Sequence, residues 1–279
     1  VRSYRSNMPE VVSKYAGLGL GWTHNYASYI AFELNGANQE PSALVRPDGT
    51  FVPLIKKNGG ASYVDTVGAR ITVAACCTSS QWTVYLPSGG TELYTEQNLP
   101  EFGELGVLTE LHDPVGRVTK VIHSSDVKNA VDYVIGPFGH VLTVDSWEVY
   151  QTAACPESPY ILQALQGNGI WLMRVQGFTD PAGNVVTFGS NPTVDPCNAS
   201  TWVYNNNSVY YPENQQVDYG YGASPSQVSK LLTSVSYHVT NGTEVQHSNA
   251  SYYGDGRVYT ASEGAVGGPN VGAVQFAYT

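Results

Sequence analysis

The sequence predicts an all-β protein whose hairpins continue as one long, twisted antiparallel sheet, and three observations lead to this prediction. Only 13% of the 279 residues are charged, against roughly 25% in an average soluble domain, and Gly, Tyr, Ser, Thr and Asn take their place. Apolar and polar residues alternate along short segments such as 27–34, 80–87 and 140–150, which is the pattern of half-buried strands. Similar turn motifs separate these segments.

Each turn motif places a proline or an Asx residue ahead of a glycine. Proline fixes φ at the first corner of a tight turn, and glycine accepts the positive φ at the next corner. We expect the aspartate of such a turn, as at Asp113 and Asp180, to accept a backbone N–H bond from two residues further on. The motif occurs at 46–50, 86–90, 113–117, 136–140, 180–184, 239–243 and 254–257.

The spacing of the turn glycines predicts a repeating hairpin. Gly49 and Gly90 are 41 residues apart, Gly116 and Gly139 are 23 apart, and Gly139 and Gly183 are 44 apart. Isolated hairpins cannot bury their apolar faces, so successive hairpins continue as one sheet. We therefore expect one domain over 1–279, with an opening segment at 1–34, hairpin repeats at 35–191, and insertion-bearing hairpins with a terminal strand at 192–279.

The last segment, 271–279, alternates like a strand and needs a neighbour for its edge groups. A further hairpin of a longer chain would supply that neighbour, or a second copy of the protein would. Strand addition by successive copies would build an open fibre. Self-association into a homopolymer, or contact with the remaining parts of a longer chain, is therefore the expected partnership.

Charge and motif content exclude several classes of function. The net charge is −10 and the 13 Lys and Arg are scattered singly, so the sequence predicts no nucleic-acid partner. No stretch approaches about 18 consecutive apolar residues, so it predicts no membrane span. The six histidines lack the spacing of metal ligands, and no nucleophile has a recognisable base and acid. We expect no enzyme, no catalytic residue, no metal and no cofactor.

The glycine-rich run at 17–21 invites comparison with a phosphate-binding loop. That loop needs a helix after the glycines, whereas the following residues alternate like a strand. The run is therefore interpreted as a structural start signal, with Trp22 closing the first end of the sheet and His24 as a hydrogen-bonded structural histidine. The predicted structural residues are Gly17, Gly19, Gly21, Trp22, His24 and Tyr26.

Four cysteines, few lysines and low charge favour an oxidising compartment and disulfide bonds. The cysteines are Cys76, Cys77, Cys155 and Cys197, and three pairings are possible. A Cys155–Cys197 bridge would join two proline-containing loops. It would leave Cys76 to pair with Cys77 in a strained vicinal bridge, which counts against it.

Four sequons offer positions for N-glycosylation. They are Asn198, Asn206, Asn241 and Asn249, within a polar part of the chain. Their number is close to what chance gives in a chain rich in Asn, Ser and Thr, so the number alone predicts no glycan.

The opening residues resemble the segment that opens the shell of RHS/YD-repeat proteins. The matching residues are Arg2, Tyr4, Ser6, Gly17, Leu18, Gly19, Gly21, Trp22, His24 and Tyr26. Segments 108–125 and 173–191 also resemble degenerate YD repeats, with a strand, an Asp-x-x-Gly turn and a second strand. The resemblance implies a sheet that spirals, in some members into a hollow shell, and a secreted or surface-exposed protein.

One family activity is not carried over to this chain. Self-cleaving members have paired Asp-Pro-x-Gly motifs close together near the end of the shell. Here Asp113 and Asp180 are 67 residues apart and neither lies near the C-terminus.

These observations lead to one functional hypothesis and two alternatives. The leading hypothesis is an extracellular structural or adhesive protein, a subunit or segment of a surface filament or shell assembled through edge-strand pairing. The first alternative is a fragment of a toxin-encapsulating RHS shell. The second is a carbohydrate-binding module, because stripes of tyrosine on a sheet can stack on sugars.

Overall fold

The computed structural model of the chain is all-β, as the sequence predicts. It describes residues 2–4, 15–16, 18, 22–35, 38–57, 60–66, 70–76, 80–99, 103–124, 130–151, 170–191, 205–222, 231–240, 242–253, 258–265 and 271–277. The strands are β1 Arg2–Tyr4, β2 Trp22–His24, β3 Tyr29–Asn35, β4 Asn38–Val45, β5 Phe51–Lys56, β6 Ser62–Asp65, β7 Thr72–Cys76, β8 Gln81–Tyr85, β9 Thr91–Leu99, β10 Gly103–His112, β11 Val118–His123, β12 Val131–Ile135, β13 Val141–Gln151, β14 Ile170–Thr179, β15 Val185–Asn191, β16 Asn205–Tyr211, β17 Gln215–Tyr221, β18 Leu232–His238, β19 Glu244–Tyr252, β20 Val258–Ala265 and β21 Val271–Gln275.

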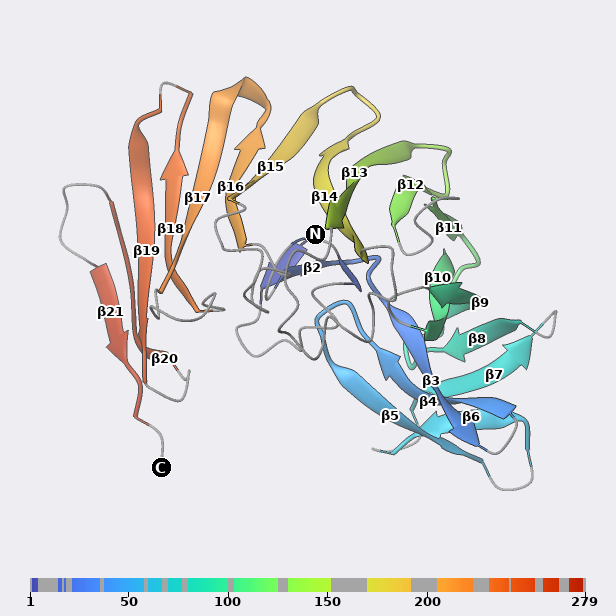
Figure 1. The fold of residues 1–279 in the computed structure, drawn as a ribbon. Coiled ribbons are helices and arrows are strands. Elements are labelled where there is room, and N and C mark those ends of the chain that lie inside the picture. Colours follow the sequence, from blue (N-terminus) through green and yellow to red (C-terminus); the bar gives the residue numbers. More distant parts are fainter. Residues whose placement is uncertain are drawn as a thin grey trace.

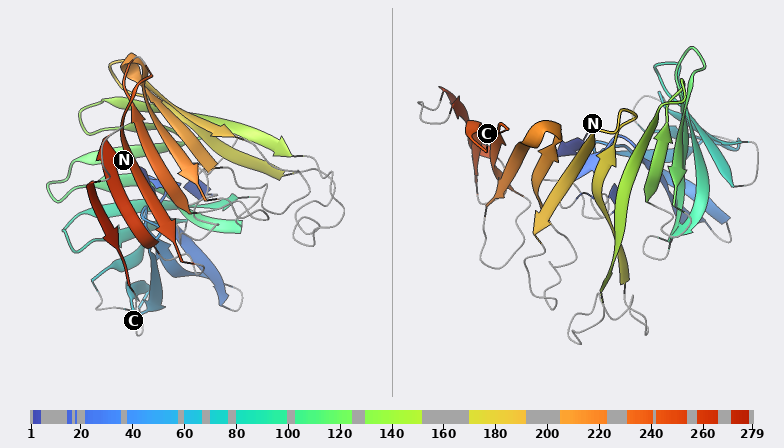
Figure 2. Two further views of the ribbon diagram at one scale, coloured as in Figure 1. Left: turned by 90° about the vertical axis from the view of Figure 1, so that its left-hand side faces the viewer. Right: turned by 90° about the horizontal axis from the view of Figure 1, so that it is seen from above.

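The strands from β3 to β21 pair antiparallel in the order in which they follow one another in the chain. A separate pair, β1 with β2, belongs to the opening segment. Figure 1 shows the consecutive strands following one another around a curve, and Figure 2 shows the later ones side by side as one twisted sheet. The long antiparallel sheet of hairpins predicted from the turn spacing is therefore confirmed.

The sheet closes on itself once, at strand β10. Residues 105–107 of β10 pair with residues 29–31 of β3, so β3 to β10 form an eight-stranded ring. Residues 110–112 of the same strand pair with β11 instead. The strands β11 to β21 therefore leave the ring as a continuing sheet, called the outgoing sheet below. The pairing of 29–31 with 105–107 is called the seam.

The seam is packed on both faces. On the inner side, fully buried Ile30 lies against Gly106, where an added Cβ would stand only 3.1 Å from the Ile30 Cβ. On the other side, Tyr15 of the opening segment packs on Tyr29, with ring centroids 4.5 Å apart, within a cluster that includes Val107. A glycine at 106 therefore allows the two strands to meet, and the opening segment covers the seam.

One hydrophobic core extends from the inside of the ring onto the inner face of the outgoing sheet. Its buried members are Leu18, Trp22, Ile30, Leu44, Leu54, Tyr63, Val73, Trp82, Val84, Tyr94, Leu108, Val121, Val131, Val134, Val144, Val175, Phe188 and Val209. Burial declines along the outgoing sheet: Val209 on β16 is fully buried, whereas Tyr237 on β18 is 41% exposed. The ring is thus a filled barrel, and the later part of the outgoing sheet has an uncovered inner face.

Six of the predicted turns share one geometry. In each turn, the backbone N–H of the first residue donates a hydrogen bond to the carbonyl of the fifth. The backbone N–H of the fourth residue, a glycine, donates to the carbonyl of the first. The glycine adopts φ between +77° and +84° in all six, at Gly49, Gly89, Gly116, Gly139, Gly183 and Gly242. This is the three-residue hairpin loop in which a type I turn is followed by a left-handed residue. The seventh predicted turn, 254–257, lies outside the described residues.

The structure corrects one assignment within these turns. The sequence spacing used Gly90 as the turn glycine, but the positive φ belongs to Gly89. Gly90 has a different reason to be glycine, because an added Cβ would lie 2.8 Å from the carbonyl oxygen of His112 on the neighbouring strand. The close approach lets the turn at 86–90 abut the turn at 113–117.

All six turns lie on the same side of the sheet, where the even-numbered strands end; this row of strand ends is called the turn edge below. They follow β4, β8, β10, β12, β14 and β18, which are all even-numbered strands. Because each strand runs antiparallel to the next, even-numbered strands all end at the same edge. A uniform turn chemistry therefore builds a row of similar tips along one side of the protein.

Replacing Gly116 by alanine is expected to lower the free energy of unfolding by about 1–2 kcal/mol, because a left-handed conformation places Cβ against the following carbonyl. Gly136 in the next turn is a matched control, since it lacks positive φ and an added Cβ has room there. Gly136→Ala should be neutral or slightly stabilising. Urea unfolding midpoints of both variants test this, and equal effects at the two positions would contradict it.

Candidate functional site

The opening segment places its predicted structural residues at the ring. Strand β2 pairs with β1, with Trp22 opposite Tyr4 and His24 opposite Arg2. Trp22 and His24 are buried, Tyr26 is half-buried, and Trp22 belongs to the main core. Gly17, Gly19 and Gly21 lie outside the described residues, so their predicted role stays a prediction.

Trp22 joins the opening segment to the outgoing sheet. Its indole Nε1 donates a 2.7 Å hydrogen bond to the hydroxyl of Tyr221, 199 residues away in the chain. Its ring also meets Tyr219 edge-on, with centroids 4.8 Å apart. Both tyrosines lie on β17, so this side chain fixes a strand of the outgoing sheet against the ring.

His24 is held as a neutral, structural side chain. Its Nδ1 accepts a hydrogen bond from the backbone N–H of Tyr26 at 3.2 Å. Burial is the largest of the causes that lower the pKa of His24 to about 4. A histidine that is uncharged near neutral pH and occupied by a backbone donor fits the predicted hydrogen-bonded role.

A buried polar network lies inside the ring near the turn edge. Arg46 donates two hydrogen bonds to Glu92, at 2.5 and 3.0 Å, and the hydroxyl of Tyr94 donates to the same carboxylate at 2.8 Å. The Ser28 hydroxyl lies 2.8 Å from the Tyr94 hydroxyl and donates to the carbonyl of Val45. Burial raises the pKa of Tyr94 well above its usual value. The network satisfies buried polar groups and therefore reads as structural.

The cysteine and sequon positions are only partly described. Cys76, the last residue of β7, is disulfide-bonded. The other three cysteines, Cys77, Cys155 and Cys197, lie outside the described residues, so the structure does not say which of them is its partner. The pairing therefore stays a prediction. Asn249 is exposed on β19, and Asn206 lies on β16. Asn198 and Asn241 fall outside the described residues.

Within the described part of the chain, no group of three or more His, Cys, Asp or Glu side chains is placed to hold a metal ion. No helix among the described residues is long and apolar enough to cross a membrane.

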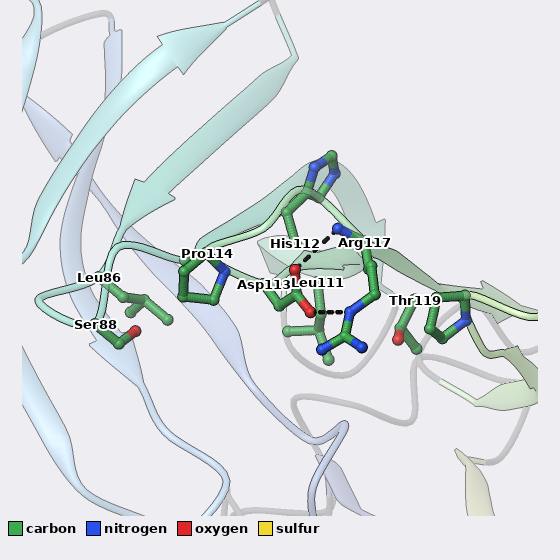
Figure 3. A pocket seen from close by; sticks show the side chains of 10 residues that line it. Leu86, Ser88, Leu111, His112, Asp113, Pro114, Arg117 and Thr119 are labelled. Atoms are coloured by element: carbon green, nitrogen blue, oxygen red, sulfur yellow. Dashed lines mark hydrogen bonds and ion pairs between the residues drawn. The ribbon is translucent and has the colours of Figure 1, made fainter.

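The described surface has a hollow at the turn edge, where three turns meet. Its volume is about 470 Å³, and the half-buried Leu86 and Leu111 are among the residues that line it. Pro114 (Figure 3) and Pro137, from neighbouring turns, also line the hollow. Polar groups at the hollow come from Ser88, His112, Asp113, Arg117 and Thr119.

Asp113 organises the central turn of the hollow. Its carboxylate accepts a hydrogen bond from the backbone N–H of Val115 at 3.0 Å. It also accepts hydrogen bonds from the backbone N–H of Arg117 at 2.9 Å and from Arg117 Nε at 2.5 Å (Figure 3). The bond from the Arg117 backbone is the largest of the interactions that hold the pKa of Asp113 below its usual value. The prediction that the Asp113 carboxylate accepts a hydrogen bond from the backbone N–H two residues further on is therefore confirmed.

The turn at 180–184 repeats this arrangement with a different fifth residue. Asp180 accepts from the backbone N–H groups of Ala182 and Asn184, both at 2.8 Å, and from the side-chain amide of Asn184 at 2.8 Å. The Asn184 amide is the main cause of the lowered pKa of Asp180. An asparagine therefore completes the turn as well as the arginine does at 117.

Sequence reasoning found the turns but missed the hollow between them. Each turn is encoded locally, whereas the hollow depends on which turns lie side by side. The second glycine at Gly90 was the available signal, because only a close neighbour explains two successive glycines at 89 and 90.

No family model matches the chain, and no curated protein matches it. Among solved structures, it is similar to a chain of the TcdB2-TccC3-Cdc42 complex at 12% identity and a TM-score of 0.42, over 89% of this chain and 15% of the other. It is also similar to a Photorhabdus luminescens Tc holotoxin pore, at 12% identity and a TM-score of 0.39, over 85% of this chain and 14% of the other. The N-terminal domain of effector protein SpvB from Salmonella typhimurium gives 12% identity and a TM-score of 0.32, over 95% and 92%.

The chain thus spans about 15% of the length of the first of these structures. With TM-scores from 0.32 to 0.42, these likenesses assign neither a family nor an activity to it.

Lowering the pH from 7 to 4.5 should destabilise the protein through His24. Its folded pKa of about 4 lies below the unfolded value of about 6.5, so the unfolded state binds more protons between these values and stability falls as the pH falls. The loss from this residue is about 2 kcal/mol over that interval. Urea unfolding of the protein and of His24→Gln at both pH values isolates the contribution of His24 to the loss of stability. An identical pH dependence in the two proteins would contradict the account.

Proposed function

We propose that the chain is a non-catalytic structural protein whose sheet forms part of the wall of an extracellular filament or shell. The observation that carries this proposal is the divided pairing of β10, which closes the ring with β3 and also starts the outgoing sheet with β11. A sheet that closes once and then continues can lengthen by adding hairpins, and its first end is already sealed.

The described burial pattern supports a role as a wall. The ring is filled and Trp22 ties it to β17, so the first end is rigid. Toward β21 the side chains become exposed, with Val274 at 51%. β21 pairs with β20 on one side, and among the described strands no residue-by-residue pairing involves its other side. An exposed strand edge of this kind is where a further strand adds.

Enclosure of another polypeptide is the second proposal. The inner face of the outgoing sheet is apolar as far as β17, through Phe188 and Val217, and the curvature of the sheet gives it a concave side (Figure 1). A concave apolar face could line a compartment for a toxin, as the shell alternative requires. The length of the parent open reading frame and the presence of a further domain separate this proposal from a filament of identical copies.

A carbohydrate-binding role has less support. Sugar stacking requires neighbouring aromatic rings in one plane, whereas the tyrosines that are exposed among the described residues lie on β8, β12, β16, β18 and β20, which are not adjacent strands. The ring contact of Tyr253 with Tyr259 is edge-on, with planes at 67°.

Val274→Lys should reduce self-association, because a charge on an edge strand opposes the addition of another strand. Val245 is a matched control: it is 44% exposed on β19, which has paired strands on both sides. Light scattering after size-exclusion chromatography, with electron microscopy of the unmodified protein, measures the assembled fraction.

The filament proposal expects assemblies that Val274→Lys disrupts and Val245→Lys leaves intact. A monodisperse monomer at all concentrations, or equal effects of both lysines, would contradict assembly through β21.

A further inference from the structure

Two neighbouring tips of the turn edge carry exposed apolar side chains that their turns do not need. Val115 is 76% exposed and Phe138 is 73% exposed, each at the third position of its turn. Two other turns have Asp48 and Ser88 at that position with the same backbone geometry. Both apolar tips are on turns that contribute a proline to the hollow described above. Exposed apolar patches of this kind mark interaction surfaces more often than scattered single residues do.

Arg117 at the same place offers hydrogen-bond donors beyond those that the turn uses. Its backbone N–H and its Nε bind Asp113, and its two terminal nitrogens have no hydrogen-bond partner among the described residues. At the corresponding position Asn184 completes the turn with one amide. The guanidinium is therefore more than the fold requires, and its side chain is 56% exposed.

The arrangement favours a ligand that carries a carboxylate. The carboxylate of Asp113 already accepts three hydrogen bonds, so the terminal nitrogens of Arg117 are the charged groups at the hollow that remain available, and they can only donate. The hydroxyls of Ser88 and Thr119, which can donate or accept, lie in the same lining. A guanidinium whose Nε is fixed presents its remaining N–H groups in a planar fork that suits carboxylates. Leu86 and Leu111 add apolar side chains to the lining of the same hollow.

We propose that the hollow, with the tips at Val115 and Phe138, is a docking surface for a polypeptide segment that presents a carboxylate beside apolar side chains. The carboxylate binds the terminal nitrogens of Arg117, and the apolar side chains cover Leu86, Leu111 and the exposed tips. Because the protein has a net charge of −10, long-range attraction does not favour an acidic segment. Recognition therefore depends on the local combination of the guanidinium fork and the apolar side chains that line the hollow.

Methyl NMR of the intact protein, labelled at Leu and Val, tests the proposal directly. The probe is the capped tripeptide acetyl-Leu-Glu-Leu-amide, and acetyl-Leu-Gln-Leu-amide is the matched neutral peptide. We expect saturable shifts of the Leu86, Leu111 and Val115 methyl signals with the acidic peptide. The neutral peptide should bind at least about tenfold more weakly, because a charge-assisted hydrogen bond contributes more than the equivalent of a tenfold change.

Arg117→Asn is the informative variant, because it copies the residue that completes the turn at 184. It keeps the turn and removes the fork, so we expect at least about a tenfold loss of affinity for the acidic peptide. Phe138→Ser, at an exposed position, should weaken both peptides while leaving the fold intact. Asn184→Arg is the control that introduces a guanidinium fork without an apolar tip, because its turn has Ala182 at the third position. It should create no second binding site for the acidic peptide.

Four results would overturn the proposal. Equal binding of the two peptides, or unchanged binding of the acidic peptide by Arg117→Asn, would show that the hollow does not recognise a carboxylate. Absence of shifts in the three methyl groups at millimolar peptide would remove the docking surface. Tighter binding of glucuronate than of the acidic peptide at the same methyl groups would assign the hollow to acidic sugars instead.

Discussion

The rest of the structure depends on how the two edges of strand β10 are used. One edge pairs with β9 along almost its whole length, while the other is divided between β3 and β11. A register shift between Leu108 and Glu110 lies between the two halves, and such irregularities bend a strand and increase its twist. The divided edge closes the ring and sets the position at which the outgoing sheet begins. Trp22 and Tyr15 then secure the ring on the inside and across the seam.

The row of turns is a second consequence of the same consecutive pairing. Because each strand reverses the direction of the last, a turn motif that recurs after even-numbered strands always returns to one edge. Similar tips are thereby brought side by side, and small differences between them become chemically meaningful. At 113–117 and 136–140 those differences are Arg117, which lines the hollow, and Val115 and Phe138, which are exposed on turns that each contribute a proline to it. A repetitive scaffold thus presents one distinctive surface.

The sequence was sufficient for features that are encoded locally. Alternation predicted the strands, and Pro, Asx and Gly predicted the turns and the hydrogen bonding of Asp113 and Asp180. The seam and the Trp22–Tyr221 hydrogen bond could not be predicted, because their partners are far apart in the chain and nothing local marks them. The same limit explains the error at Gly90, whose role depends on His112 of the neighbouring strand. Trp22 and His24 were predicted as structural residues from the glycine-rich run before them and from the resemblance of the opening segment, whereas the connection of Trp22 to β17 was not predicted.

Amide hydrogen exchange at the seam is the most direct test of this account. If β10 closes the ring, the amides of residues 29–31 and 105–107 that point across the seam should exchange as slowly as those paired within β9, because both are hydrogen-bonded in a buried sheet. If the seam is open, β3 is an exposed edge. Those amides would then exchange as fast as unpaired backbone while the strands from β4 to β9 remain protected, and that result would contradict the ring and the wall built on it.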